Sequence, residues 1–178
     1  MADSILNDKR ILAVDDEPDV LETLEDLLSD YPGLVLDRAA DYNMGYQLIR
    51  SWTYDAVILD IMGVRGFDLL NAAVHLGIPA VMLSAHAVSP ESIRQSLELG
   101  ARAFIPKEKM ADIGKFLEDV LTLSHRGSVR RMFDRLGGFF NMKFGPDWQQ
   151  SEKEFWDQVV SGNYEPRPVI LEGGAKKP

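Results

Sequence analysis

Between residues 10 and 121, short apolar runs alternate with amphipathic stretches, and this alternation limits the possible folds more than any other feature. Five runs have the length of strands: 10–14, 34–39, 56–60, 79–85 and 102–107. A nearly continuous apolar run suits a strand that is buried on both faces, as in a parallel sheet covered by helices. The sequence therefore predicts an α/β fold, a doubly wound five-stranded parallel sheet.

The stretches between these runs carry helix signals. Pro18 suits the first turn of a helix, and Asp41 and Ser89 are suited to cap helix N-termini. Gly77 and Gly100 mark the ends of the third and fourth helices. Apolar residues follow each start at helical spacing, and a fifth helix is predicted before residue 121.

Charge and composition exclude several functions. Residues 1–121 carry a formal charge of −11, and residues 122–178 carry +2. The acidic part repels phosphate backbones, so direct nucleic-acid binding is not expected. The chain has no cysteine, which excludes disulfides, zinc-thiolate sites and thiol nucleophiles. Residues 1–10 lack the apolar core expected of a signal peptide, and no apolar run approaches the roughly 20 residues of a membrane span, so we expect a cytoplasmic protein.

Polar residues stand where the predicted strands end: Asp15 and Asp16 after the first, Asp60 after the third, Ser84 after the fourth and Lys107 after the fifth. In an open parallel sheet these ends share one edge, where ligands bind. Clustered carboxylates repel one another unless a cation is present, and Mg²⁺ prefers such oxygen ligands. An aspartate can accept a phosphoryl group whose oxygens a metal, a lysine and a hydroxyl contact.

Four motifs at these ends, "VDDEP" (14–18), "VILDIM" (57–62), "MLSA" (82–85) and "AFIPK" (103–107), resemble those of response-regulator receiver domains of two-component signalling. The resemblance implies a flavodoxin-like fold and a regulatory phosphoacceptor rather than an enzyme with a separate substrate. It implies that Asp60 accepts phosphate from a sensor histidine kinase or phosphotransfer protein. It also implies that Asp15, Asp16, Asp60 and the backbone carbonyl of Met62 hold Mg²⁺.

The same resemblance assigns roles to residues around the acceptor. Ser84 and Lys107 are expected to contact the phosphoryl group. Phe104 is expected to act as a switch that turns inward when Ser84 is drawn toward that group. Met62 and His86 occupy positions that tune how long the phosphoryl group survives.

Two alternatives remain open. The loop after Asp60 is shorter than in the family and lacks its proline, and Glu108 stands where a proline commonly follows the lysine. These departures are compatible with a receiver-like scaffold that binds partners without being phosphorylated. The other alternative is an aspartate-nucleophile phosphatase, which resembles a strand ending in Asp-x-Asp. Here Ile61 and Met62 follow Asp60, which disfavours it.

The chain divides into a lead (1–9), a receiver domain (10–122), a helical extension (123–162) and a flexible tail (163–178). Two amphipathic helices are predicted in the extension, at 128–145 and 146–162. The first places apolar side chains on one face: Val129, Met132, Phe133, Leu136 and Phe140. These helices should pack on the receiver, on a second copy as a homodimer, or on a downstream protein. Membrane binding is not expected, and no DNA recognition helix is evident.

Overall fold

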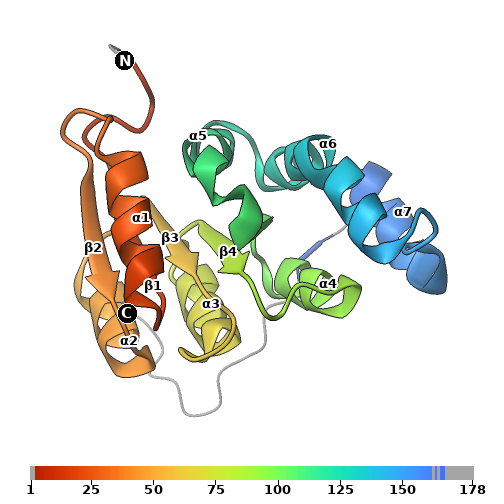
Figure 1. The fold of residues 1–178 in the computed structure, drawn as a ribbon, viewed down its shortest axis with the longest axis horizontal. Helices are drawn as coiled ribbons and strands as arrows, with labels where there is room; N and C mark the ends of the chain where they lie inside the picture. The colour runs from red at the N-terminus through yellow and green to blue at the C-terminus, as the bar shows by residue number, and fades with distance from the viewer. Residues whose placement is uncertain (1–2, 162, 164, 167–178) are drawn as a thin grey trace.

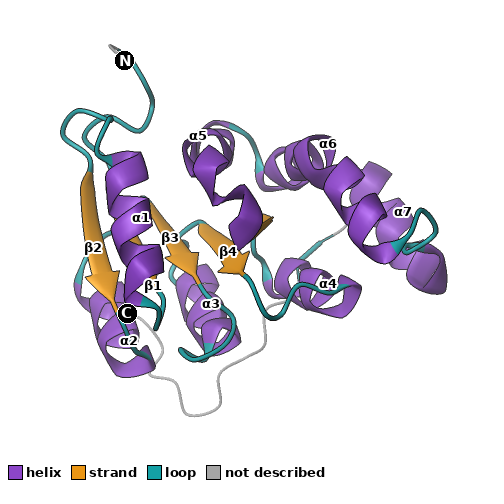
Figure 2. Cartoon of the chain, in the orientation of Figure 1, coloured by secondary structure: helices purple, strands orange, loops and turns teal. Residues whose placement is uncertain are grey.

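The computed structural model of the protein describes residues 3–161, 163, 165 and 166. Five strands alternate with helices, and two further α-helices follow at the C-terminal side (Figures 1 and 2). The elements are β1 (Arg10–Val14), α1 (Pro18–Leu28), β2 (Val35–Ala39), α2 (Tyr42–Ser51), β3 (Ala56–Leu59), α3 (Gly66–His75), β4 (Ala80–Ser84), α4 (Pro90–Leu99), β5 (Ala103–Pro106), the 3₁₀ helix η1 (Lys107–Asp112), α5 (Ile113–Thr122), α6 (His125–Phe144), the 3₁₀ helix η2 (Gln150–Glu152) and α7 (Lys153–Ser161).

The five strands form one parallel sheet in the order β2-β1-β3-β4-β5. Helices α1 and α5 contact each other on one face, while α2, α3 and α4 contact one another in sequence on the other (Figure 1). Every residue of β3, β4 and β5 is buried because helices cover both faces. The predicted doubly wound sheet is confirmed, with strand boundaries within two residues of those expected.

The predicted helix signals operate as expected. Pro18 lies at the start of α1, and the Asp41 side chain accepts a hydrogen bond from the backbone N–H of Met44. Ser89 forms a reciprocal capping box with Ser92 at the start of α4. These local interactions set where each helix begins, and so they set the loops that carry the strand-end residues.

The second helix of the extension differs from the prediction. A helix was expected over 146–162, but α7 begins only at Lys153, after turns and η2. The indole N–H of Trp148 donates to Asn141 Oδ1 of α6, and its backbone N–H donates to the carbonyl of Gly145. These contacts turn the chain back onto α6 and hold residues 146–149 outside a helix.

Helix α6 packs on the receiver, and α7 packs on α6. Helix α6 contacts α5 and β5, the edge strand of the sheet, and α7 contacts α6 (Figure 1). The buried face of α6 consists of Ser128, Val129, Met132, Leu136 and Phe140. Of the alternatives for the extension, this arrangement matches helices that cover the receiver's own surface. The predicted flexible tail falls mostly outside the described residues.

Candidate functional site

Strand register brings two of the predicted carboxylates together. Val14 at the end of β1 pairs with Leu59 at the end of β3, so Asp15 and Asp60 leave adjacent strands at the same level. Both side chains are buried, whereas Asp16 is exposed. Burial follows from position, because both aspartates directly continue fully covered strands.

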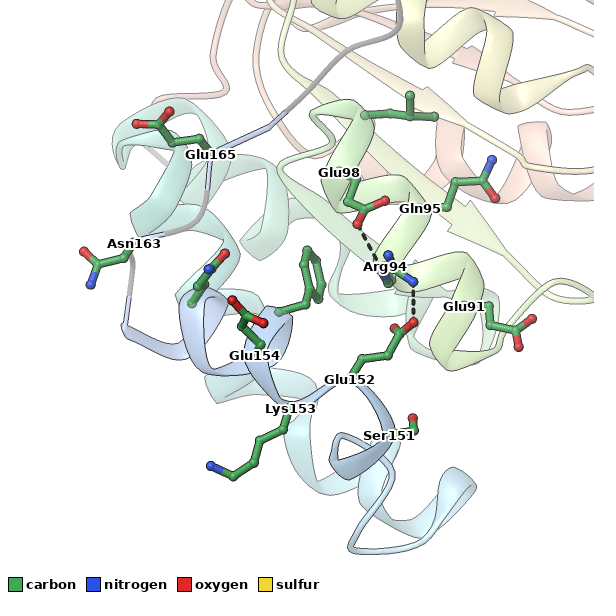
Figure 3. Close-up of a pocket in the computed structure, with 13 residues that line it drawn as sticks. Glu91, Arg94, Gln95, Glu98, Ser151, Glu152, Lys153, Glu154, Asn163 and Glu165 are labelled. Carbon is green, nitrogen blue, oxygen red and sulfur yellow. Dashed lines mark hydrogen bonds and ion pairs between the residues drawn. The ribbon is translucent and has the colours of Figure 1, made fainter.

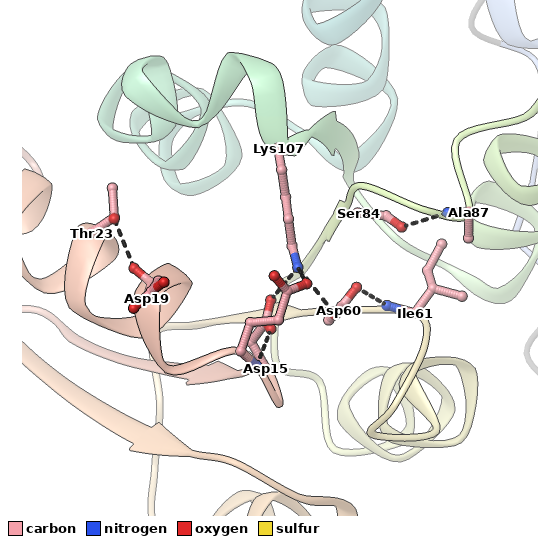
Figure 4. A network of polar contacts seen from close by, with 9 residues as sticks. Asp15, Asp19, Thr23, Asp60, Ile61, Ser84, Ala87 and Lys107 are labelled. Atoms are coloured by element: carbon pink, nitrogen blue, oxygen red, sulfur yellow. Dashed lines mark hydrogen bonds and ion pairs between the residues drawn. The ribbon is translucent and has the colours of Figure 1, made fainter.

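Lys107 joins these carboxylates from the end of β5, which lies two strands away from β3 in the sheet. Its Nζ lies 2.9 Å from Asp15 Oδ2, 3.2 Å from Asp60 Oδ2 and 3.0 Å from Glu17 Oε1 (Figure 4). The lysine follows β5 directly, and its side chain is only 10% exposed. Lys107 is also the first residue of η1, and Glu108 after it does not prevent this reach. The ammonium group of Lys107 is thus shared among three carboxylates.

The pKa shifts in the site follow from burial and from the excess of carboxylates over positive charge. Burial, followed by the neighbouring charge of Asp15, raises the pKa of Asp60 to about 6, although Lys107 opposes the shift. Burial also raises the pKa of Asp15. Burial disfavours the charged form of Lys107, but the carboxylates of Asp15, Glu17 and Asp60 outweigh it and raise its pKa. The lysine therefore stays charged, and the site retains excess negative charge.

The loop after Asp60 lies tightly against the site. Asp60 Oδ1 accepts a hydrogen bond of 2.8 Å from the backbone N–H of Ile61. A Cβ at Gly66 would lie 1.8 Å from the backbone carbonyl oxygen of Asp60, and one at Gly63 would lie 2.2 Å from Asp16 Oδ2. Gly63 also has a positive φ of 85°. The shortened loop therefore depends on glycine at the two points where it meets the aspartates.

The site also contains Ser84, at the end of β4. It is buried, and its Oγ accepts a 3.3 Å hydrogen bond from the backbone N–H of Ala87 (Figure 4). Met62 and His86, the two predicted lifetime-tuning residues, are exposed on the loops after β3 and β4. Ser84 and Asp60 thus lie at the ends of the neighbouring strands β4 and β3 (Figure 4).

Phe104 lies in the inward position that was expected only after switching. Its side chain is 0% exposed, and all four residues of β5 are buried. Strand β5 pairs with β4 on one side, and α6 contacts it on the other. The C-terminal helices therefore take part in enclosing the strand that carries this aromatic residue.

The residues present suit a hard divalent cation. Asp15, Asp16, Glu17 and Asp60 each offer a carboxylate oxygen, and these atoms all lie within 4.8 Å of one another. Asp15 Oδ2 is buried, and Lys107 Nζ lies 2.9 Å from it. Oxygen ligands of this kind are those that Mg²⁺ favours. No role in the site is predicted for Glu17 from the sequence, and its position next to Asp16 was the available signal.

Comparison with known proteins agrees with this geometry. The sequence profile of the response regulator receiver domain matches residues 11–118, more than half of the chain. The chain belongs to the response regulator receiver family. The alternatives, a receiver-like scaffold that is not phosphorylated and an aspartate-nucleophile phosphatase, are not favoured by this match. Among the described residues, no helix is both long and apolar enough to cross a membrane.

Similar receiver proteins come from several bacteria. The chain is 34% identical over 107 residues to the transcriptional regulatory protein DltR of Streptococcus agalactiae serotype III (strain NEM316), covering 58% of this chain and 47% of that protein. It is 32% identical over 124 residues to the transcriptional regulatory protein CusR of Escherichia coli (strain K12), covering 67% and 53%. The solved receiver domain of NtrX from Brucella abortus is 33% identical, with a TM-score of 0.56 and coverage of 64% and 99%. The chain thus spans about half the length of these curated relatives.

Proposed function

We propose that the protein is a phosphorylation-controlled switch in which Asp60 accepts a phosphoryl group from a sensor histidine kinase or phosphotransfer protein. The observation that carries this proposal is the sharing of Lys107 Nζ between Asp15 and Asp60, at 2.9 and 3.2 Å. A lysine in that position holds the acceptor carboxylate in place and can contact an incoming phosphoryl oxygen. Membership of the receiver family supports the same assignment.

The transfer exchanges one bond for another. A carboxylate oxygen of Asp60 attacks phosphorus in line as the bond from phosphorus to the donor's histidine nitrogen breaks. The electron pair of the broken bond stays on that nitrogen. Lys107 neutralises charge on the phosphoryl oxygens, and the Ser84 hydroxyl can donate a hydrogen bond to one of them.

Asp15, Asp16, Asp60 and the backbone carbonyl of Met62 are the proposed ligands of Mg²⁺. When bound, the ion supplies further neutralisation of the phosphoryl oxygens and relieves repulsion among the carboxylates. Glu17, whose carboxylate belongs to the same acidic cluster, is available as an additional contact or as a partner for Lys107.

Signal output is proposed to follow from repacking next to Ser84. Phe104 pairs in register with Met82, two residues before Ser84, so a shift of the serine is felt by this buried ring. Exposed Met62 and His86 are proposed to control access of water to the acyl phosphate, and so its lifetime. Output is proposed to be protein binding, in the cytoplasm where ATP-dependent kinases supply the phosphoryl group.

The names of the curated relatives describe transcriptional regulation. This chain shares only about half of their length, so that role is not carried over to it. Homodimerisation likewise stays a prediction for measurement.

Intact-mass spectrometry after incubation with acetyl phosphate and Mg²⁺ tests the proposal without knowledge of the kinase. We expect a gain of one phosphoryl group that requires Mg²⁺ and is absent from the Asp60→Asn variant. A gain that persists in Asp60→Asn would refute Asp60 as the acceptor.

A further inference from the structure

The C-terminal hairpin, defined as α6, η2 and α7 (residues 125–161), rests on the receiver through two different kinds of contact. The first is apolar and tight: α6 packs on β5 and α5 with four fully buried apolar side chains, Val129, Met132, Leu136 and Phe140. Arg135 adds a forked contact to Asp119 of α5, at 2.7 and 3.3 Å. This half of the interface resembles a protein core and is costly to open.

The second contact, between α4 and the segment η2–α7, is polar and contains a groove. A groove of about 1210 Å³ separates α4 from η2 and α7, and most of the side chains that line it are charged or polar (Figure 3). Arg94 of α4 spans the groove, donating to Glu98 on its own helix and to Glu152 on η2. Its guanidinium also lies 5.6 Å from the centre of the Phe155 ring. Arg94 and Glu152 are each more than a third exposed, so solvent and salt weaken their pairing.

Two chains of contacts connect the hairpin to residues of the phosphoacceptor site, and the first begins at Ser84. Ser84 Oγ accepts from Ala87 N–H, and the Ser92 hydroxyl in the first turn of α4 donates to the Ala87 carbonyl. Arg94 lies two residues further along the same helix. A movement of Ser84 therefore reaches the groove through one loop and less than two turns of helix.

The other connection begins at Lys107, the first residue of η1. Glu108 Oε1 lies 3.8 Å from Nζ of Lys143, near the end of α6, and Lys109 Nζ lies 5.4 Å from the centre of the Phe139 ring. The residues directly after the site's lysine thus touch the hairpin. The two groups expected to contact a phosphoryl group, Ser84 and Lys107, thus lead to different parts of the hairpin: to η2 and α7 through Arg94, and to α6 through Glu108 and Lys109.

We propose that the C-terminal hairpin is the output element of this receiver and that Arg94 is its latch. Phosphorylation of Asp60 draws Ser84 and Lys107 toward the phosphoryl group, displaces the start of α4 and η1, and separates Arg94 from Glu152. Helix α6 stays packed on β5, while η2 and α7 move away from α4 and widen the groove. This inference rests on the proposed phosphorylation of Asp60.

The division of the interface makes such a movement feasible. Breaking one partly exposed ion pair demands little differential free energy, whereas detaching α6 would expose four apolar side chains. Coupling between two sites is also reciprocal, so a variant that opens the groove should bind a phosphoryl mimic more tightly.

The absence of cysteine from the chain allows a direct distance measurement. Gln95→Cys on α4 and Gln158→Cys on α7 place two spin labels on exposed residues that line opposite sides of the groove. Phosphorylation by acetyl phosphate and Mg²⁺, followed by intact mass on the same sample, should widen the label separation by about 5 Å or more. A control pair, Lys115→Cys on α5 and Arg131→Cys on α6, lies on exposed residues of two helices that stay packed together and should keep its separation.

The outcomes separate the two proposals. A gain of one phosphoryl group with an unchanged Gln95–Gln158 separation would overturn the latch and leave the proposed function intact. If no phosphoryl group is gained and beryllium fluoride with Mg²⁺ does not bind, the proposed function fails, and the latch fails with it.

Two isosteric variants test the two ion pairs that Arg94 makes. Glu152→Gln removes the charge across the groove and should widen it without phosphorylation, while tightening binding of beryllium fluoride about fivefold. Glu98→Gln removes the other partner of Arg94, on the same helix, and should leave the separation unchanged. Equal behaviour of the two variants would contradict a latch between Arg94 and Glu152.

Discussion

Replacing Asp60 with asparagine should stabilise the protein at neutral pH when Mg²⁺ is removed. The carboxylate is 5% exposed, and burial followed by the charge of Asp15 raises its pKa to about 6 from 3.8. At about 1.4 kcal/mol per pH unit, this shift corresponds to at most about 3 kcal/mol against the ionised form. Asparagine keeps an oxygen for the Ile61 N–H, but its amide group faces Lys107 less favourably than a carboxylate. We therefore expect a net gain of about 1–2 kcal/mol in the free energy of unfolding.

The dependence of this gain on pH follows from the direction of the pKa shift. The folded protein binds the proton of Asp60 more tightly than the unfolded chain, so protonation favours the wild-type fold. The gain from Asp60→Asn should be largest above pH 6, shrink as pH falls through about 6, and close near pH 3.8.

Urea denaturation with a chelator, at pH 8 and at pH 4.5, measures both quantities. Asp68→Asn serves as a control, because Asp68 is exposed and pairs with Arg65 on the surface, and it should change stability by less than about 0.5 kcal/mol. The reasoning is refuted if Asp60→Asn is no more stable than the wild type at pH 8, or if its advantage is the same at both pH values.

Three further predictions concern the metal, the loop after Asp60 and the first residue of α6. Mg²⁺ at ten times its dissociation constant should raise the free energy of unfolding by about 1.4 kcal/mol, measured by urea titration, and Asp60→Asn should lose most of this increase. Gly66→Ala should lower the free energy of unfolding by about 2 kcal/mol or more, because its Cβ would lie 1.8 Å from the carbonyl oxygen of Asp60. Gly138→Ala, whose Cβ would have nothing within 4 Å, should raise it by about 0.5–1 kcal/mol. Similar urea midpoints for the two variants would contradict this. Burial, followed by the charge of Arg102, lowers the pKa of His125 to about 4 from 6.5. As pH falls from 6.5 to 4, the wild type should therefore lose about 1–2 kcal/mol of unfolding free energy relative to His125→Gln. A difference that stays constant over this range would contradict the lowered pKa.

The order of the strand-end residues could be predicted because each apolar run ends at a polar residue, and parallel register then places these residues on one edge. Val14 and Leu59 pair in register, so adjacency of Asp15 and Asp60 followed from the fold alone. The capping roles of Asp41 and Ser89 were equally local and were confirmed.

Features that depend on distant contacts could not be predicted in this way. Glu17 joins the site only because Lys107, 90 residues away, reaches it. The late start of α7 depends on Trp148 bonding back to Asn141, and the groove depends on Arg94 meeting a residue 58 positions further along. Phe104 was expected to move inward, and it is already inward in a strand that α6 contacts.

The most direct test of the account is to identify the residue that carries the phosphoryl group. After incubation with acetyl phosphate and Mg²⁺, reduction with borohydride converts an aspartyl phosphate to homoserine, which peptide mass spectrometry can locate. The account predicts homoserine at position 60 and unmodified aspartate at Asp15 and Asp16. Homoserine at another aspartate in a phosphorylated sample, with Asp60 unmodified, would contradict it.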